Sequence, residues 1–352
     1  MSDNRRPSGK KVLLSVLVTV LSVILVLLVA FTVYVEWVLG KFYYEPEQQE
    51  ETLSSQQLES LLQSQAGEET IDPSAPTVDP NEIEWTEAPV IEPGEHIFNF
   101  LLVGQDRRPH EIRARSDSMI LLTVNTETAE LYVTSIMRDM YVSIPGYGSN
   151  RINVPYAIKG AELLFDTLEK NFGLRPDKFI EVDFNGFVKA VDLVGGVDVH
   201  LTKEEARHLS RNEAAYDFPD EDWELVEGIN HLTGSQALSF ARCRSVDGTG
   251  DFSRTRRQRD VLKALLEKAS TLSVLELNEL VITMSEYVTT NLSSDEIMGY
   301  SARFIPLLKD LRVINQRIPA DGTYYTATVE GVGSVIMPSL QKNREILEAT
   351  QK

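Results

Sequence analysis

The chain has 352 residues, 42% of them hydrophobic, and a formal net charge of −19. This length and composition exclude a disordered tail and allow one large domain or two ordinary ones. The negative charge disfavours binding to nucleic acid, and the single cysteine, Cys243, excludes an intramolecular disulfide and a cysteine-based metal site.

A long apolar stretch lies near the amino terminus. From Val12 to Val35 the chain has no charged residue, which is long enough for a helix to cross a hydrocarbon core of about 30 Å. A cleavable signal peptide has a shorter apolar region followed by a small-residue cleavage site, and this stretch has neither. We therefore predict a transmembrane helix over 12–39. Basic residues precede it and acidic residues follow it, so residues 1–11 are expected to be cytoplasmic and the rest extracytoplasmic, as in a single-pass cell-membrane protein.

The next segment, 40–95, is strongly acidic. No Lys or Arg occurs between Lys41 and Arg107, whereas 14 acidic residues lie between 42 and 95. The segment is rich in Glu, Gln, Ser and Pro, a composition that cannot bury enough apolar surface to fold alone. We predict an acidic extracytoplasmic linker here, followed by a catalytic domain over 96–352.

The domain alternates strand and helix patterns. Strand patterns occur at 97–104, 118–125, 130–136, 179–184 and 197–201. Helical spacing occurs at 160–172, 184–194, 203–211, 232–242, 253–270 and 338–350. Beyond residue 270 we expect strands and turns before that last helix. The fold class is therefore α/β: a three-layer α/β/α sandwich with a central mixed sheet, preceded by one transmembrane helix.

Arginines and aspartates gather in four short stretches of the domain. The first and third directly follow predicted strands, and the second directly precedes one, which are positions where sites are commonly built. In chain order the stretches contain Asp106, Arg107 and Arg108; Arg115 and Asp117; Arg138 and Asp139; and Arg242, Arg244, Asp251, Arg254, Arg256, Arg257, Gln258 and Arg259.

These residue types point to a phosphorylated ligand. Guanidinium groups bind phosphate oxygens in pairs and stay charged, so a cluster of arginines suits a pyrophosphate. Asp106 and Asp117 supply oxygen ligands of the kind that Mg²⁺ takes together with phosphate oxygens and water. If 253–263 is helical, Arg254, Arg257 and Gln258 share a face, whereas Arg256 and Arg259 point elsewhere.

Each of these residues also has a structural explanation. A single arginine is more often the partner in a surface ion pair than a ligand, and a short Arg-Asp pair can cap a turn. Asp139 is a candidate for such a structural partner, and Cys243 is better explained as a small packed residue than as a nucleophile. The phosphate interpretation therefore depends on the stretches coming together in the fold.

Together, and in this order, the stretches resemble the LytR-CpsA-Psr family. The resemblance covers about 97–265 and is carried by LLVGQD and two following arginines, RSDSMILLTVN, SIMRDMYVSIPGYGSNRINVPYA, EVDFNGFVKAVDLVGGVDV, LTGSQALSFARCRS and GDFSRTRRQ. Two positions depart from the family pattern. Met137 replaces a proline and Ser253 replaces a glycine, changes that alter loop geometry without removing a charged position.

The resemblance implies an enzyme of cell-wall biogenesis. Such an enzyme is a Mg²⁺-dependent phosphotransferase that moves an anionic glycopolymer, such as teichoic acid or capsule, from a polyprenyl-pyrophosphate carrier to peptidoglycan, forming a phosphodiester. The polyprenyl chain would lie in an apolar slot of the domain. Asp106 and Asp117 would hold Mg²⁺, and Asp251 would position or deprotonate the acceptor hydroxyl. With Arg138, these three aspartates are the candidate catalytic residues. The candidate pyrophosphate contacts are Arg108, Arg115, Arg138, Arg242, Arg244, Arg254, Arg257 and Gln258.

Two alternatives remain open at the level of the sequence. Water could replace the wall hydroxyl, which would make the protein a polyprenyl-pyrophosphate glycan hydrolase. The protein could also be a non-catalytic sensor of wall precursors that attenuates transcription. Direct action on DNA is disfavoured because the short segment before the predicted span has no room for a DNA-binding fold.

Overall fold

The computed structural model describes residues 75–105, 114–210, 223–243 and 250–352, together with 43–44, 58, 62 and 246. The predicted transmembrane segment 12–39 and the site residues Asp106, Arg108 and Arg244 lie outside these residues. Within the described part of the chain, no helix is long and apolar enough to cross a bilayer.

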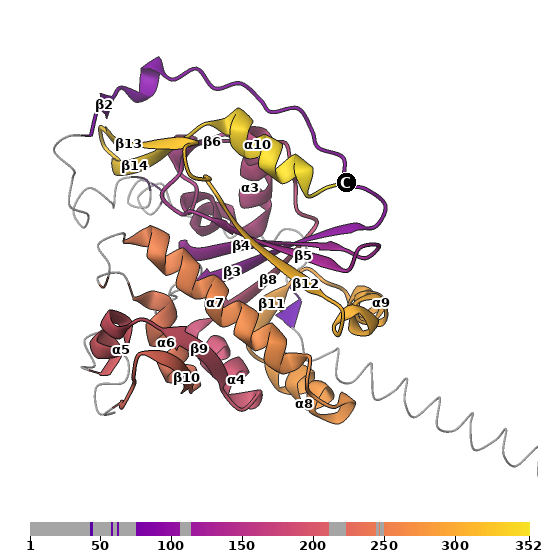
Figure 1. Cartoon of the computed structure of the whole chain (residues 1–352). Helices are drawn as coiled ribbons and strands as arrows, with labels where there is room; N and C mark the ends of the chain where they lie inside the picture. Colours follow the sequence, from indigo (N-terminus) through magenta and orange to yellow (C-terminus); the bar gives the residue numbers. More distant parts are fainter. Residues whose placement is uncertain are drawn as a thin grey trace, which may run out of the picture.

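A mixed sheet of seven strands forms the centre of the molecule (Figure 1). Its strands, in spatial order, are β1 (Tyr43–Tyr44), β11 (Val288–Thr290), β8 (Lys178–Asp183), β3 (Ile97–Gln105), β4 (Ser116–Asn125), β5 (Glu130–Ile136) and β12 (Arg312–Ile318). β8, β3, β5 and β12 share one direction, whereas β4 runs antiparallel to both β3 and β5. The carboxyl ends of those four strands and the beginning of β4 therefore meet at one edge, which we call the C-edge.

Helices lie on both faces of this sheet (Figure 1). One face packs against α3 (Val154–Phe172) and α10 (Leu340–Ala349) through a core that includes Leu101, Met119 and Leu121. The other face carries α7 (Asp251–Ala269), which also contacts α6 (Gly234–Arg242). Next to these lie α4 (Phe184–Leu193), α5 (Lys203–Ser210), α8 (Val274–Met284) and α9 (Ser294–Phe304), which leads into the short helix η2 (Ile305–Leu307). The predicted mixed α/β fold with a central mixed sheet is confirmed.

Three small sheets surround the central one. They pair β9 (Val197–Leu201) with β10 (Gly228–Leu232), β6 (Tyr141–Ile144) with β7 (Gly148–Arg151), and β14 (Gly333–Pro338) with β13 (Tyr324–Val329) and β2 (Thr77–Val78). The strand expected at 197–201 therefore belongs to a separate two-stranded sheet and not to the central sheet. The helix expected from residue 160 begins at Val154, with non-helical backbone at Lys159 and Gly160.

Part of the predicted linker packs onto the domain. Beyond β2 and the short helix η1 (Pro80–Glu82), the Trp85 ring lies 6.0 Å from that of Tyr141, and Ile91 is buried in the main core. The Ile91 amide donates to the carbonyl of Gly173 at 2.7 Å. Gly173 has a φ of +77°, and a Cβ there would lie 2.0 Å from the carbonyl oxygen of Pro89. Only glycine lets this segment pass so close to the end of α3.

The carboxyl terminus is bonded into the start of β3. Gln351 is buried, and its side-chain carbonyl accepts a hydrogen bond from Asn99 at 2.7 Å. The Gln351 backbone carbonyl accepts from Gly94 at 2.9 Å, and the Asn125 amide donates to the carbonyl of Lys352 at 3.3 Å. The last residues of the chain thus complete the hydrogen bonding of the sheet at the end opposite the C-edge.

Candidate active site

Arg138 occupies the middle of the C-edge. It follows β5 directly, and its side chain is only 12% exposed. Its guanidinium donates to Asp117 at 2.7 Å, and its Nε lies 3.5 Å from carboxylate oxygens of both Asp139 and Asp251. Burial alone would lower the pKa of Arg138, but the charges of Asp139, Asp251 and Asp117 outweigh it and raise that pKa. Arg138 is therefore a permanent, fixed cation that brings three separate stretches of the sequence together.

The first turn of α7 supplies the neighbouring pair. Asp251 is the first residue of this helix and forms an ion pair with Arg254, which is almost completely buried. The Asp251 carboxylate is 13% exposed and lies between Arg138 and Arg254. Two cations thus hold it in one orientation at the C-edge, with both carboxylate oxygens buried.

Arg115 and Arg151 add further positive charge. Burial, and next the charge of Arg151, lower the pKa of Arg115. Arg151 is 3% exposed, lies 3.9 Å from the Asp139 carboxylate through its Nε, and donates to the carbonyl of Ser334 at 2.6 Å. Arginines held this close in a partly buried site repel each other, so a bound anion would stabilise the arrangement. Arg151 is a site residue that was not predicted, although it is the arginine of the segment RINVPYA.

Gln258, further along α7, and Arg242, from α6, reach the same edge. Gln258, one turn after Arg254 on α7, accepts a hydrogen bond from the Ser118 hydroxyl at 3.1 Å. This contact places it beside β4, close to Asp117. Arg242 ends α6, and its guanidinium lies 4.3 Å from the centre of the Phe184 ring, at the carboxyl end of β8. The C-edge therefore collects predicted residues from β4, β5, α6 and α7.

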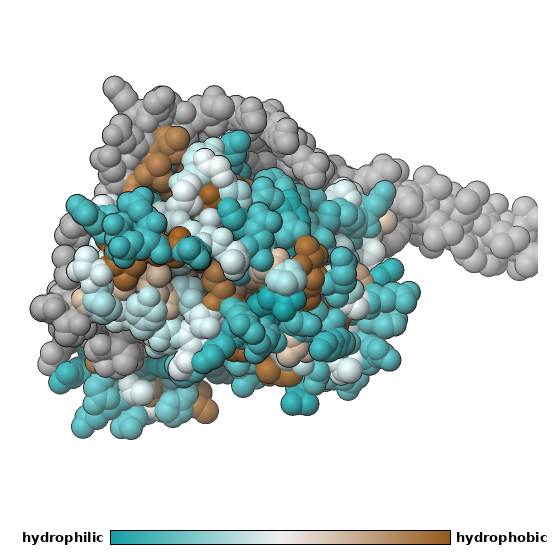
Figure 2. Space-filling view, turned by 90° about the horizontal axis from the view of Figure 1, so that it is seen from above, coloured by the Kyte–Doolittle hydropathy of each residue, from teal (hydrophilic) through white to brown (hydrophobic). Residues whose placement is uncertain are grey.

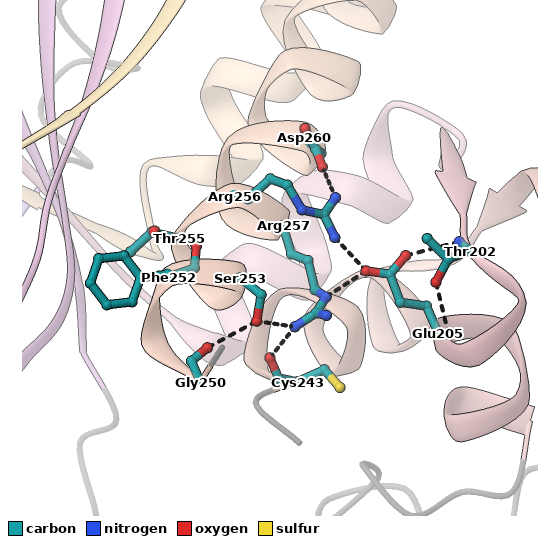
Figure 3. Close-up of polar contacts among 10 residues, drawn as sticks. All are labelled: Thr202, Glu205, Cys243, Gly250, Phe252, Ser253, Thr255, Arg256, Arg257 and Asp260. Carbon is teal, nitrogen blue, oxygen red and sulfur yellow. Dashed lines mark hydrogen bonds and ion pairs between the residues drawn. The ribbon is translucent and has the colours of Figure 1, made fainter. Parts of the chain in front are cut away.

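Arg257 has a different environment from the one predicted (Figure 3). It is fully buried and donates to Glu205 at 2.8 Å, to the carbonyl of Cys243 at 2.7 Å and to the Ser253 hydroxyl at 3.1 Å. Arg256 contacts the same Glu205 oxygen. The expected separation of Arg257 from Arg256 is therefore wrong, because both side chains turn toward α5.

One carboxylate of the predicted metal pair can be placed. The Asp117 side chain is 33% exposed at the C-edge. Among the described residues no group of three or more His, Cys, Asp or Glu side chains is arranged to hold a metal ion. A Mg²⁺ ion commonly takes one or two carboxylates and fills its remaining positions with phosphate oxygens and water. Asp117 at an arginine-rich edge fits that type of site, in which the ligand completes the metal shell.

The sheet face under α7 is apolar but incompletely covered. Ile120, Leu131 and Val133 are buried there, whereas Leu102 and Leu122 in the same cluster are only half-buried. The helix α9 also packs on this face, through Tyr300 and Phe304 against Phe100. Leu102 and Leu122 nevertheless keep some exposed apolar surface that another group could cover. Figure 2 shows the molecule from above, on the side away from α7, where the surface is mostly hydrophilic and apolar residues are exposed in separate groups.

Comparisons with known proteins identify the family of the chain. The model of the LytR_cpsA_psr family matches residues 55–349. The polyisoprenyl-teichoic acid–peptidoglycan teichoic acid transferase TagU of Bacillus cereus is 36% identical over 226 residues, which cover 64% of this chain and 69% of that protein.

Solved structures share the fold. Protein gbs0355 of Streptococcus agalactiae superposes with a TM-score of 0.63 at 25% identity, over 72% of this chain and 88% of that one. TagT, a Bacillus subtilis protein, in a structure bound to LIIa-WTA gives a TM-score of 0.60 at 25% identity, over 80% and 99% of the two chains. With the family model spanning most of the sequence, this chain belongs to the LytR_cpsA_psr family.

Proposed function

We propose that this protein transfers an anionic glycopolymer from a polyprenyl-pyrophosphate carrier to peptidoglycan and forms a phosphodiester bond. The observation that carries the proposal is the arrangement around Arg138, where arginines and aspartates from β4, the turn after β5 and the start of α7 converge on one edge of the sheet. The name of the Bacillus cereus relative, a teichoic acid transferase acting on a polyisoprenyl-linked donor, supports the same reaction.

In the proposed reaction, a hydroxyl of the acceptor attacks the phosphorus on the sugar side of the pyrophosphate. The new phosphorus–oxygen bond forms as the bond to the bridging oxygen breaks, and polyprenyl phosphate leaves. Asp251 would orient the hydroxyl and take its proton. Arg138, Arg254 and Arg115 would bind the pyrophosphate and stabilise the charge that develops on the leaving phosphate. When bound, Mg²⁺ would be held by Asp117 together with Asp106 and would neutralise further phosphate charge.

The proposal also includes a binding place for the polyprenyl chain and a membrane anchor near the lipid donor. The half-buried leucines under α7 suit a polyprenyl chain, since that face borders the C-edge where the pyrophosphate would lie. We also propose that residues 12–39 anchor the protein as a single transmembrane helix with the domain outside the cell. The donor is itself a membrane lipid, so an anchored enzyme would meet it without leaving the bilayer surface.

The test is an Arg138→Ala substitution in the full-length protein in detergent. With a polyprenyl-pyrophosphate saccharide, peptidoglycan fragments and Mg²⁺, we expect the rate of polyprenyl phosphate release to fall by roughly 10²-fold or more. Arg175→Ala is the matched control, because Arg175 also contacts three carboxylates but lies at the end of α3. Its rate should stay within about twofold of the wild type, since exposed ion pairs contribute little.

The assay also separates the alternatives. Release that depends on the acceptor supports transfer. Release that proceeds equally without acceptor would establish a hydrolase, and tight donor binding without any release would indicate a sensor. Unchanged transfer in Arg138→Ala would overturn the site assignment.

A further inference from the structure

A group of aromatic and cationic side chains lies next to the proposed site and is not used by the mechanism above. The rings of Phe252 and Tyr324 are stacked, with centroids 5.2 Å apart and planes inclined by 26°. The guanidinium carbon of Arg317 lies 4.6 Å from the centre of the Phe252 ring. We call Phe252, Tyr324 and Arg317 the aromatic platform. All three side chains are only partly buried, so the platform is open to solvent at its edges.

The fold places this platform directly beside the reacting groups. Phe252 follows Asp251 in the first turn of α7. Arg317 lies on β12 opposite Ser135 of β5, three residues before Arg138. The platform and the Arg138 cluster therefore occupy neighbouring strand ends of the C-edge. A molecule bound on the platform would therefore lie beside Asp251, the residue that precedes Phe252 in α7.

The platform also carries positive charge, from the guanidiniums of Arg317 and the neighbouring Arg259, and few nearby carboxylates neutralise it. Arg259 donates to the Ser135 hydroxyl at 2.7 Å, and its pKa is lowered by burial and then by the charge of Arg317. Arg317 pairs with Asp321, but that carboxylate is 91% exposed and the pair is therefore weak. The nearby acids are Asp321, which is exposed, and Asp260, which also pairs with Arg256. An anionic group on a ligand would therefore stabilise the two guanidiniums.

Tyr324 offers a ligand both an apolar ring face and a polar hydroxyl. The ring packs on Phe252, whereas the hydroxyl makes no hydrogen bond to the described residues and is not among the buried polar atoms, so it is accessible to a ligand. Sugar rings offer both surfaces, because one face carries C–H groups that pack on an aromatic ring while hydroxyls at the rim form hydrogen bonds.

We propose that the aromatic platform is the binding subsite for the acceptor, a glycan strand that bears acidic groups. The strand would lie against Tyr324 and Phe252, with Arg317 and Arg259 facing its anionic groups, and would present one sugar hydroxyl to Asp251. This inference rests on the proposed function and adds the acceptor side to it. The position beside Asp251, and not beside Arg115 and Asp117, favours the acceptor over the donor polymer, whose charged sugars are the other source of the same chemistry.

The test uses full-length protein with Tyr324→Ala and Arg317→Gln, and Tyr325→Ala as the matched control. Tyr325 is the next residue on β13 and is 53% exposed. We expect the KM for a peptidoglycan glycan fragment to rise about tenfold in the first two variants, as for the loss of a stacked or charged contact. The KM for the polyprenyl-pyrophosphate donor should not change, and the control should behave as the wild type.

Other outcomes of these experiments also decide the inference. A rise in the donor KM with an unchanged acceptor KM would assign the platform to the donor polymer and overturn the proposal, as would no change in either. Tyr324→Phe keeps the stack, and its retained folding with a raised acceptor KM would support the role of the hydroxyl. Direct binding of the glycan fragment, measured by calorimetry without donor, tests the platform even if no transfer is detected; equal affinity in wild type and Arg317→Gln would contradict it.

Discussion

Arg257 and Glu205 form a buried pair that joins α7 to α5. Arg257 is 0% exposed and the Glu205 side chain is 3% exposed, whereas Arg256, which shares the same carboxylate, is 41% exposed (Figure 3). The two arginines therefore contact one acid from very different environments. Removing the buried partner leaves an uncompensated charge in the interior, whereas removing the exposed partner leaves the pair intact.

Arg257→Ala should consequently lower the free energy of unfolding by about 3–5 kcal/mol. Arg256→Ala, the matched control, should lower it by about 0–1 kcal/mol because exposed pairs contribute little. Urea unfolding at neutral pH measures both. Equal losses in the two variants would show that burial does not set the contribution of these arginines.

The same pair predicts how stability depends on acid. Burial alone would raise the pKa of Glu205, but the hydrogen bond from the Thr202 amide and the contacts with Arg257 and Arg256 lower it below the ordinary value of 4.5. A carboxylate whose pKa is lower in the folded state adds stability above its unfolded pKa and loses that contribution as the pH falls through the folded value. Stability should therefore decline as the pH drops below 4.5.

Glu205→Gln tests this dependence. The variant should be less stable than the wild type at neutral pH, and the difference should shrink as the pH falls below 4.5. Thermal unfolding followed across this range, with Glu204→Gln on the exposed side of the same helix as control, gives the measurement. A constant difference at all pH values would rule out the ionised carboxylate as the source of the stability.

At the scale of single residues, the sequence allowed chemistry to be predicted better than orientation. The convergence of Asp117, Arg138, Asp251 and Arg254 was expected, because each charge lies near a strand or helix end. Arg257 could not be assigned from spacing alone. Its direction depends on Glu205, a residue 52 positions away on α5, and only the tertiary packing of the two helices brings the pair together.

At the scale of elements, the segment before β3 belongs to the packed structure. Trp85 contacts Tyr141, Ile91 is 6% exposed, and β2 pairs with β13. Its composition predicted a linker, because few apolar residues are present to form a core of their own. Those few pack against Tyr141, the end of α3 and β13, which are distant in the sequence, and composition cannot show such contacts.

A fragment of residues 96–352 should therefore be less stable than one of residues 75–352. We expect a loss of about 2–5 kcal/mol, since Ile91 and Trp85 leave apolar cavities in two clusters. Denaturant midpoints of the two fragments measure the difference. Midpoints that coincide would mean that the segment packs without contributing stability.

Two helices after residue 270 were missed although the sequence marks their beginnings. Ser273 and Glu276 form a capping box at the start of α8, and Ser293 and Glu296 form another at the start of α9. A Ser followed three residues later by Glu is a recognised start of a helix. The helix α9 buries none of its residues fully, so it lacks the apolar face that indicated helices of similar length such as α4 and α6.

At the scale of the whole molecule, the order of the strands could not be obtained from the sequence. The strand β12, Arg312–Ile318, pairs in parallel with β5, Glu130–Ile136, although β5 lies 182 residues earlier in the sequence. Local patterns indicate that a strand exists, but its neighbours depend on which surfaces remain unpaired when the sheet assembles. The aromatic platform depends on this late pairing, because it brings Arg317 next to Phe252.

The buried carboxyl terminus has a consequence for biosynthesis. Gln351 and Thr350 are buried, and Gln351 bonds to Asn99 at the beginning of the first long strand. Because Asn99 and Gln351 are 252 positions apart, the ribosome adds Gln351 long after it has added Asn99. The strands near Asn99 can collapse earlier, but the Asn99 side chain lacks this partner until Gln351 has been made. If the domain is exported through the membrane as an unfolded chain, this bond forms only after Gln351 has crossed.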